Sequence, residues 1–331
     1  MQELIEIQGS DDLKNVDGLS ALPEFPSELL VRHRPDAHWL LVEDGHPAGR
    51  CSLWWRNTPP YEGHRVGLIG HYAANGSEAG AALLDHACQQ LAARGCTLAV
   101  GPMDGSVWHR YRFITHRGPE AVFLTEPDND DEWPGHFSQN GFTALATYHS
   151  SLANDLTHRD PHTHRAEARL IQKGVHLRPL NLDQFEEELR RFYRITMISF
   201  RKHFLFQPID EAEFLGLYRP MRPVLRADMT LLAERDGQTI GFAFAVPDVL
   251  QARCGAPVDT VVINTVAVLP DHAGAGLGGL LLERVQAIAR ELGYRRAIHA
   301  LMHHSNISRN VSRRYATPMR VYTLFAKSLR A

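Results

Sequence analysis

The chain has 331 residues, and at about 150 residues per domain this length favours two domains, each able to bury its own core. Hydrophobic residues make up 44% and charged residues 22%, a composition that excludes a disordered, collagen-like or coiled-coil chain. Lys and Arg number 35 against 38 Asp and Glu, for a formal net charge of -3. We therefore expect no nucleic acid partner and no membrane partner, because both attract strongly basic surfaces.

The four cysteines show no Cys-x-x-Cys spacing, and a chain of this size needs no disulfide bonds to fold, so we expect a reducing cytoplasm. The first 30 residues are rich in Asp and Glu and contain no apolar stretch typical of a signal peptide. No run of about 18 apolar residues occurs either. The sequence thus predicts neither a signal peptide nor a membrane span.

In the first half, residues 39–55 show a strand, a turn at Asp44-Gly45 and a second strand. Further along, residues 101–112 are rich in turn-forming, polar and aromatic residues. This composition suggests the wall of a substrate pocket, and the alternative is a surface loop that packs one Trp and one Tyr into the core. The candidate substrate-binding residues are Asp104, Trp108, His109 and Arg112.

A polar, His-rich segment, residues 154–173, separates the two halves and lacks any strand pattern. It is typical of a linker or connecting helix that begins near Asp160-Pro161. We therefore predict a first domain over 1–153, a connection over 154–173 and a second domain over 174–331. The histidines at 158, 162 and 164 have no Cys or carboxylate at metal-ligand spacing, so we expect no metal site.

The second half contains a longer series of predicted elements. In chain order they are a strand over 175–180, helices over 182–200 and 211–218, a hairpin over 229–246 with its turn at Asp236-Gly237, a strand over 260–269, a glycine-rich turn, a helix ending near Gly293, a strand over 297–302, a helix starting near Ser305 and a final strand over 320–329.

The two halves resemble each other. Displacing the chain by 198 residues places Gly76 on Gly274 and Gly95 on Gly293, and in both halves a hairpin precedes the glycine-containing helix start. This pattern predicts two copies of one fold, with chance similarity of two helix starts as the alternative. The first copy has Glu78 opposite Gly276, and a carboxylate there would repel a phosphate group.

Glycines at a helix start expose backbone N–H groups, and these donors and the helix dipole favour an anion such as phosphate. The acidic residue expected about 20 positions after a dinucleotide-binding loop is absent, and no Gly-Lys-Ser/Thr follows. A nicotinamide enzyme or a nucleoside-triphosphate enzyme is therefore disfavoured.

Residues 268–278, from Val268 through Pro270 to Gly276 and Gly278, resemble the acetyl-CoA-binding motif V-x-P-x-x-[RQ]-x-x-G-x-G/A of the GCN5-related N-acetyltransferase (GNAT) superfamily. The resemblance implies an α/β protein of two tandem GNAT-like domains, each a mixed, mostly antiparallel twisted sheet flanked by helices. It also implies acetyl-CoA (CoA) as cofactor. The implied cofactor-binding residues are Val266, Ala267, Val268, His272, Ala273, Gly274, Ala275, Gly276, Leu277, Gly278, Gly279, Asn306, Ser308 and Arg309.

Two positions depart from the GNAT pattern. Ala273 stands where the motif has Arg or Gln, so a side-chain donor is missing unless His272 replaces it. In addition, the strand before the loop carries Asn264 and Thr265 where the family often has a carboxylate base. Acetyl transfer needs a deprotonated amine and a protonated leaving thiolate. The candidates are Glu234, His303 or His304 as base and Tyr315 or, second, Tyr322 as acid.

Together these features predict an N-acyltransferase that moves acetyl from acetyl-CoA directly to a small-molecule or peptide amine within a ternary complex. Two alternatives stay open, namely a non-catalytic binding module that has kept the fold and an acyltransferase with a larger donor. The protein is expected to be a monomer or a homodimer, because a contact between the two copies could replace the dimer of single-copy relatives.

Overall fold

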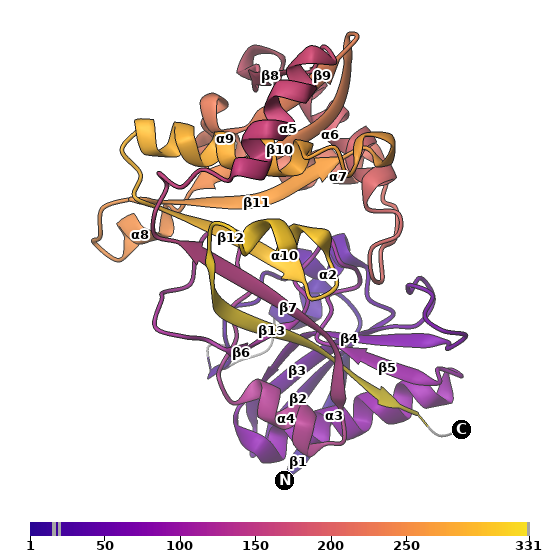
Figure 1. Ribbon diagram of the computed structural model, residues 1–331. Helices are drawn as coiled ribbons and strands as arrows, with labels where there is room; N and C mark the ends of the chain where they lie inside the picture. Colours follow the sequence, from indigo (N-terminus) through magenta and orange to yellow (C-terminus); the bar gives the residue numbers. More distant parts are fainter. Residues whose placement is uncertain (15–17, 19–20, 330–331) are drawn as a thin grey trace.

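The computed structural model describes residues 1–14, 18 and 21–329. Its strands join one sheet in the order β1-β2-β3-β4-β5-β13-β7-β12-β11-β10-β9-β8, and β6 pairs with β13 beside this path (Figure 1). The strands are β1 Gln2–Ile7, β2 Ala37–Glu43, β3 His46–Trp54, β4 Val66–Ala74, β5 Leu98–Gly101, β6 Phe113–His116, β7 Thr143–Ala153, β8 His176–Pro179, β9 Leu231–Arg235, β10 Gln238–Pro247, β11 Thr260–Val268, β12 Arg296–His303 and β13 Thr317–Ser328.

Helices cover the sheet on both faces. They are α1 Ser10–Lys14, α2 Glu28–His33, α3 Gly76–Ala93, α4 Trp133–Gln139, α5 Pro161–Gln172, α6 Phe185–Ser199, α7 Glu211–Tyr218, α8 Leu250–Arg253, α9 Leu277–Glu291 and α10 Ile307–Ser312, with short 3-10 turns η2 Leu182–Gln184, η3 Arg219–Val224, η4 Ala227–Met229 and η5 Pro270–His272. Among the described residues, none of the helices combines the length and the apolar character that crossing a bilayer requires.

Two hairpin turns and the start of one helix lie where local sequence signals predict them. The turns at Asp44-Gly45 and Asp236-Gly237 join β2 to β3 and β9 to β10, and all four turn residues have positive φ angles, as a two-residue hairpin turn requires. Helix α5 begins directly after Asp160, whose side chain accepts a hydrogen bond from the His162 N–H at 3.0 Å.

The two halves exchange their last strands. Strand β7, which ends the first half, pairs with β12 of the second half, and β13, which ends the chain, pairs with β5 of the first half. The two exchanged strands also pair with each other, with Tyr322 opposite Tyr148. Figure 1 shows β7 and β13 running between the two halves. Neither half therefore has a complete sheet without a strand from the other.

The two faces of the second-half sheet carry different helices. Phe242 and Phe244 of β10 pack in the core that contains α6 and α7, whereas Ala243 and Ala245 pack in the core that contains α5 and α9. Alternate residues of a strand point to opposite faces, so α5 and α9 cover one face and α6 and α7 the other.

The connection from strand to helix differs between the copies. In the first half only Asn75 separates β4 from α3, whereas residues 269–276, here called the glycine loop, separate β11 from α9. The first copy thus has no loop that could wrap a phosphate group. The expectation that the first copy binds no CoA rested on the charge of Glu78, which lies inside the first turn of α3. The missing loop is a stronger reason for the same expectation.

The first copy also lacks a gap between its central strands. Strands β4 and β5 pair in parallel up to Leu68 and Val100, and the chain after β5 stays close, because the Met103 N–H donates to the Ile69 carbonyl at 2.8 Å. A Cβ on Gly70 would lie 2.3 Å from the Met103 carbonyl oxygen. Glycine at position 70 therefore allows the segment after β5 to fill the space between the strands.

Candidate functional site

The central strands of the second half separate. Strands β11 and β12 pair in parallel from Thr260 with Arg296 to Ile263 with His299, and no pairing is recorded beyond that point. Strand β11 contains a bulge directly after this last pair. Ile263 and Thr265 lie opposite the neighbouring residues Ala245 and Phe244 of β10, so Asn264 has no partner on β10. From Asn264 onward β11 thus makes no ladder bonds with β12, and we call this gap the strand divergence.

A second irregularity lies on the other side of the divergence. The pairing of β12 with β7 shifts between His299 and Met302, and Leu301 has a φ of 60°, a conformation uncommon for a non-glycine residue. The Leu301 N–H donates to the Ser150 hydroxyl of β7 at 3.1 Å. The bulge that turns β12 away from β11 is therefore held by a side chain of the first half.

The glycine loop leaves backbone donors free at the start of α9. Gly276 precedes the helix with a φ of 91°, and the Leu280 N–H makes the bond back to the Gly276 carbonyl at 3.0 Å. Within the described part of the chain, the N–H groups of residues 274–279 have no recorded acceptor outside the helix. Such a row of unpaired donors at the start of a 15-residue helix suits an anion.

The two glycines of the loop and the two in the first turn of α9 differ in what surrounds them. A Cβ on Gly276 would lie 2.5 Å from the Ala166 Cβ of α5, and one on Gly279 would lie 3.1 Å from the Thr163 hydroxyl. By contrast, a Cβ on Gly278 would meet only Val266 of β11, at 3.9 Å, and Gly274 has open space. Gly276 and Gly279 thus let α5 pack closely, whereas Gly274 and Gly278 border the space beside β11.

A segment of the first half crosses the opposite face of the sheet at the divergence. The Asn264 amide donates to the Thr125 hydroxyl at 2.6 Å. The next residue, Glu126, forms a fully buried ion pair with Arg320 and accepts a hydrogen bond from the Tyr322 hydroxyl. Sequence reasoning missed Glu126, because it stands in a polar loop far from the strand where a carboxylate was expected.

Four of these groups form a continuous series of hydrogen bonds in which each donates to the next. The Leu301 N–H donates to Ser150, Ser150 donates to the Tyr322 oxygen at 2.9 Å, and Tyr322 donates to Glu126. Burial raises the pKa of Glu126 despite its bonds to Tyr322 and Arg320, and burial together with Glu126 raises the pKa of Tyr322. Tyr322 and the Glu126 side chain are fully buried, so this series of hydrogen bonds supports the bulge of β12 from inside the protein.

Comparison with known protein families shows which family this part of the chain matches. The family described as Acetyltransferase (GNAT) family matches residues 185–314, which include α6, the glycine loop, β12 and α10. The second half of the chain belongs to the GNAT family. Its glycine loop and strand divergence lie where the GNAT resemblance in the sequence placed the CoA site.

The whole chain shares its fold with solved GNAT structures. It matches a tandem GNAT protein from the clavulanic acid biosynthesis pathway with a TM-score of 0.52 and 14% identity, over 100% of this chain and 99% of that one. It also matches a GCN5-related N-acetyltransferase from Sphaerobacter thermophilus with a TM-score of 0.51 and 14% identity, over 99% and 96% of the two chains. The α/β tandem GNAT fold expected from the sequence is thus confirmed.

A curated relative gives a further comparison. The chain is 25% identical over 218 residues to a protein named bacterial ceramide synthase from Caulobacter vibrioides (strain NA1000 / CB15N). The match covers 65% of this chain and 56% of that protein. The match thus spans only about half the length of this relative.

The predicted pocket wall of the first half contacts the GNAT half only in part. The Trp108 indole N–H donates to the Gln207 carbonyl at 2.8 Å, and His109 lies 3.8 Å from the Glu213 carboxylate. Arg112 is buried with its guanidinium 4.1 Å and 4.2 Å from the rings of Tyr111 and Tyr148.

Asp104 does not join that wall. It is 8% exposed, and its carboxylate accepts the His71 N–H at 2.6 Å inside the first half.

The proposed acid and one proposed base each have hydrogen-bond or ion-pair partners in the fold. The Tyr315 hydroxyl donates to Glu283 at 2.8 Å and contacts Thr163 at 2.9 Å, so Tyr315 joins α5 to α9. Glu234 forms an ion pair with Arg178 at the β8 edge of the sheet. Tyr315 and Glu234 thus make hydrogen bonds or ion pairs with residues far away in the chain. The spacing of residues in the sequence cannot reveal such contacts.

The two histidines at the end of β12 also differ. His304 has an exposed side chain, and its N–H donates to the Thr147 carbonyl at 3.0 Å. The ring of His303 packs against Tyr148 and Phe204, with centroids 4.9 Å and 5.3 Å away. Its buried Nε2 has no recorded partner, and burial lowers its pKa to about 4.

The predicted contacts on α10 have structural partners. The Asn306 side chain accepts the Ser308 N–H at 3.2 Å and thereby caps the helix. The Arg309 guanidinium donates to the His304 carbonyl at 3.4 Å. Helix α10 reaches the start of α9 through Val311, whose side chain would lie 3.8 Å from a Cβ on Gly279.

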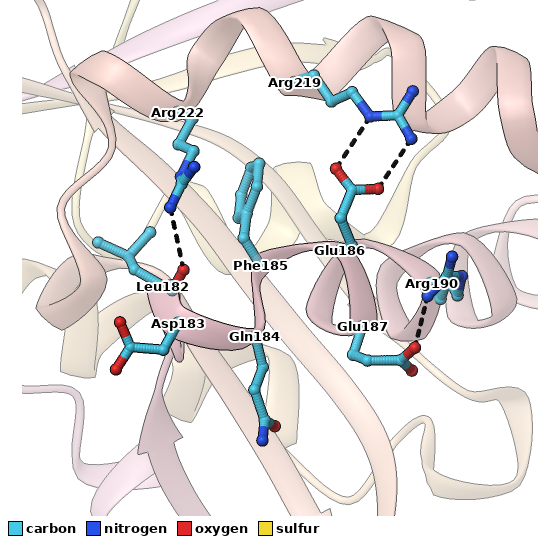
Figure 2. A pocket seen from close by; sticks show the side chains of 9 residues that line it. All are labelled: Leu182, Asp183, Gln184, Phe185, Glu186, Glu187, Arg190, Arg219 and Arg222. Atoms are coloured by element: carbon cyan, nitrogen blue, oxygen red, sulfur yellow. Dashed lines mark hydrogen bonds and ion pairs between the residues drawn. The ribbon is translucent and has the colours of Figure 1, made fainter.

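A groove of about 710 Å³ lies away from these groups, at the start of α6 (Figure 2). Most of its charged side chains already have partners: Arg219 pairs with Glu186 at 2.8 Å, and Arg190 pairs with Glu187 and with Glu211. We therefore assign the candidate site to the glycine loop and the divergence and not to this groove.

Proposed function

We propose that this protein is an acyl-CoA-dependent N-acyltransferase. The observation that carries the proposal is the combination of free N–H groups over residues 274–279 with the adjoining divergence of β11 and β12. The free donors fit the pyrophosphate of CoA. The edge of β11 that no longer pairs with β12, between Asn264 and Ala267, offers strand-like partners to the amide groups of the pantetheine arm. The first half lacks both features, so we propose one donor site per chain.

The residues at the divergence suggest how the reaction proceeds. The amine must lose a proton as it attacks the thioester carbonyl, and backbone N–H groups stabilise the charge that develops on the oxygen. Asn264 is not a base, and the buried carboxylate of Glu126 is already paired. His303 remains as a neutral imidazole at pH 7 with an unpartnered nitrogen. The Nδ1 atom of His303 accepts the Ser305 N–H at 3.3 Å, so the unpartnered Nε2 atom of the neutral ring carries the proton. We infer that His303, in preference to His304, positions the acyl acceptor by donating a hydrogen bond from Nε2 and does not itself take the proton of the amine.

The surroundings of the divergence favour an acyl group longer than acetyl. Tyr218 of α7 bonds to Thr265 of β11, and the Ser199 hydroxyl of α6 donates to the Val268 carbonyl at 3.0 Å, so these helices border the gap. Several apolar side chains in this region are only partly buried, namely Phe200, Phe204, Tyr218, Leu269 and Leu301. A longer acyl chain would cover them. The similarity to a protein named bacterial ceramide synthase supports the same choice.

The test is a donor titration followed by a transfer assay. CoA, acetyl-CoA and palmitoyl-CoA are titrated calorimetrically, and thiol release is then followed with each donor and a panel of amino acids, simple amines and long-chain amino alcohols. We expect one equivalent of donor per chain and at least about tenfold tighter binding of palmitoyl-CoA than of acetyl-CoA.

Each negative result has a distinct meaning. Equal affinity for the two acyl donors would refute the preference for a long chain. Absence of binding by any CoA derivative would refute the enzyme proposal and favour a non-catalytic binding module. Binding without thiol release in the presence of any amine of the panel would support the same module.

A further inference from the structure

The first half contains a compact cluster of groups able to ligate a metal. His33 ends α2, His71 lies on β4 and Asp104 follows β5, and one ligand atom of each lies within 4.8 Å of the others. The His33 Nδ1 and His71 Nε2 atoms are 2.9 Å apart, and the His71 Nε2 atom is 3.9 Å from the Asp104 Oδ2 atom. The cluster lies outside the acyl-CoA site described above.

Two of these three separations lie close to those of a tetrahedral zinc site, and the third, between His33 and Asp104, is within 4.8 Å and would have to be about 4 Å or less for both atoms to bind one ion. Zinc bonds of about 2.0–2.1 Å to nitrogen and oxygen place neighbouring ligand atoms roughly 3.3 Å apart. The observed 2.9 Å and 3.9 Å lie on either side of that value. We propose that His33, His71 and Asp104 bind one Zn²⁺ ion per chain.

The groups behind the ligands are arranged as metal sites require. The His71 Nδ1 atom is 2.8 Å from the Ser52 hydroxyl, which is itself 2.7 Å from the His38 Nδ1 atom. This contact turns the Nε2 atom of His71 toward His33 and Asp104. The Asp104 Oδ1 atom accepts the His71 N–H, which leaves Oδ2 for the metal. Metal-binding histidines regularly have such a partner on their second ring nitrogen.

The donor set selects the kind of metal. Two imidazoles and one carboxylate suit Zn²⁺ and related transition metals, whereas Mg²⁺ and Ca²⁺ prefer several oxygen ligands. The ring of His109 stacks on His33 with centroids 3.7 Å apart and closes one side of the cluster.

Zinc would connect three parts of the first half. It would join α2, β4 and the loop over 102–112, and the same loop carries Trp108, which contacts the second half. Sequence reasoning expected no metal because it weighed only the histidines at 158, 162 and 164. The three ligands here were not considered, since more than 30 residues separate each from the next and they match no ligand spacing.

The experiment is zinc binding by the full-length protein. The wild type is treated with a chelator, dialysed and titrated with ZnCl₂ in competition with a chelating dye, and bound zinc is counted by atomic emission. We expect one zinc ion per chain. His33→Ala and Asp104→Asn should each weaken binding more than tenfold. Ser52→Ala, which leaves all three ligands in place and removes the hydroxyl between His71 and His38, should weaken it by about 10–100-fold. Circular dichroism of each variant checks its fold.

A control separates this site from scattered surface histidines. His64 is exposed in the same half, so His64→Ala should bind zinc as the wild type does. Substitution of Co²⁺ should produce visible absorption bands in the wild type and not in His33→Ala. If the wild type binds no zinc, or if folded His33→Ala binds it equally well, the cluster is a hydrogen-bond network only and the proposal is wrong.

Discussion

Gly278 offers a direct test of the CoA site. It lies in the first turn of α9, and a Cβ there would meet only Val266 of β11, at 3.9 Å. A side chain at this position is therefore tolerated by the fold and projects into the space beside the free N–H groups. Gly276→Glu would be a poorer test, because the new side chain would collide with Ala166 of α5 and would need a positive φ angle.

We expect Gly278→Glu to weaken CoA binding by charge repulsion. A carboxylate about 5 Å from a phosphate repels it by about 3 kcal/mol at an effective dielectric constant of about 20, and salt and rotation of the side chain reduce this to about 1–3 kcal/mol. The dissociation constant should therefore rise by about 10–100-fold. Thermal stability should not fall, since Glu favours a helix over Gly by about 0.5–1 kcal/mol.

Two variants control the measurement. Gly278→Gln adds nearly the same volume without charge and should weaken CoA binding by less than about threefold. Gly216→Glu adds the same charge at a helical glycine with open space around it and should bind CoA as the wild type does. The reasoning is refuted if calorimetry shows that Gly278→Glu and Gly278→Gln bind CoA equally well.

Three further predictions concern stability. Residues 1–153 and 154–331 produced separately should each fail to give a cooperative unfolding transition, because each lacks the strand that the other supplies; two independently folded halves by circular dichroism would contradict the exchange. Glu126→Gln should lower the free energy of unfolding in urea by about 3 kcal/mol because Arg320 loses its buried counter-charge; a loss below about 1 kcal/mol would count against this role. His299 is buried and its pKa is lowered to about 4. Below about pH 6.5 the unfolded chain therefore takes up a proton at this histidine while the folded protein does not. Between pH 7 and pH 5 the free energy of unfolding should thus fall by about 2 kcal/mol more in the wild type than in His299→Gln, and equal losses would show that another group is responsible.

The internal repeat was detectable from the sequence, but its details required the structure. The displacement of 198 residues matches Leu98 of β5 to Arg296 of β12, whereas Val66 and Thr260, which begin the preceding strands, differ by 194. The second copy therefore has extra residues between strand and helix, and these form the glycine loop. A comparison with a fixed displacement cannot show this, because it assumes equal loop lengths.

The candidate catalytic groups show a similar limit. The sequence pointed to the glycine loop and to the missing carboxylate at Asn264, since both follow from residues near one another in the chain. It could not identify Glu126, which reaches the same place from a polar loop of the other half. It also assigned roles to Tyr315 and Glu234, whose hydrogen bonds and ion pairs in the fold join distant elements.

The sequence by itself determined the hairpin turns, the start of α5, the order of the elements and the loop that suits a phosphate group. These features depend on the backbone preferences of Gly, Asp and Pro and on the spacing of apolar residues, which act over a few positions. Only the tertiary structure decided the exchange of β7 and β13, the divergence of β11 from β12, and the meeting of His33, His71 and Asp104. Each of these depends on contacts between residues far apart in the chain, and such contacts arise from the packing of the whole sheet.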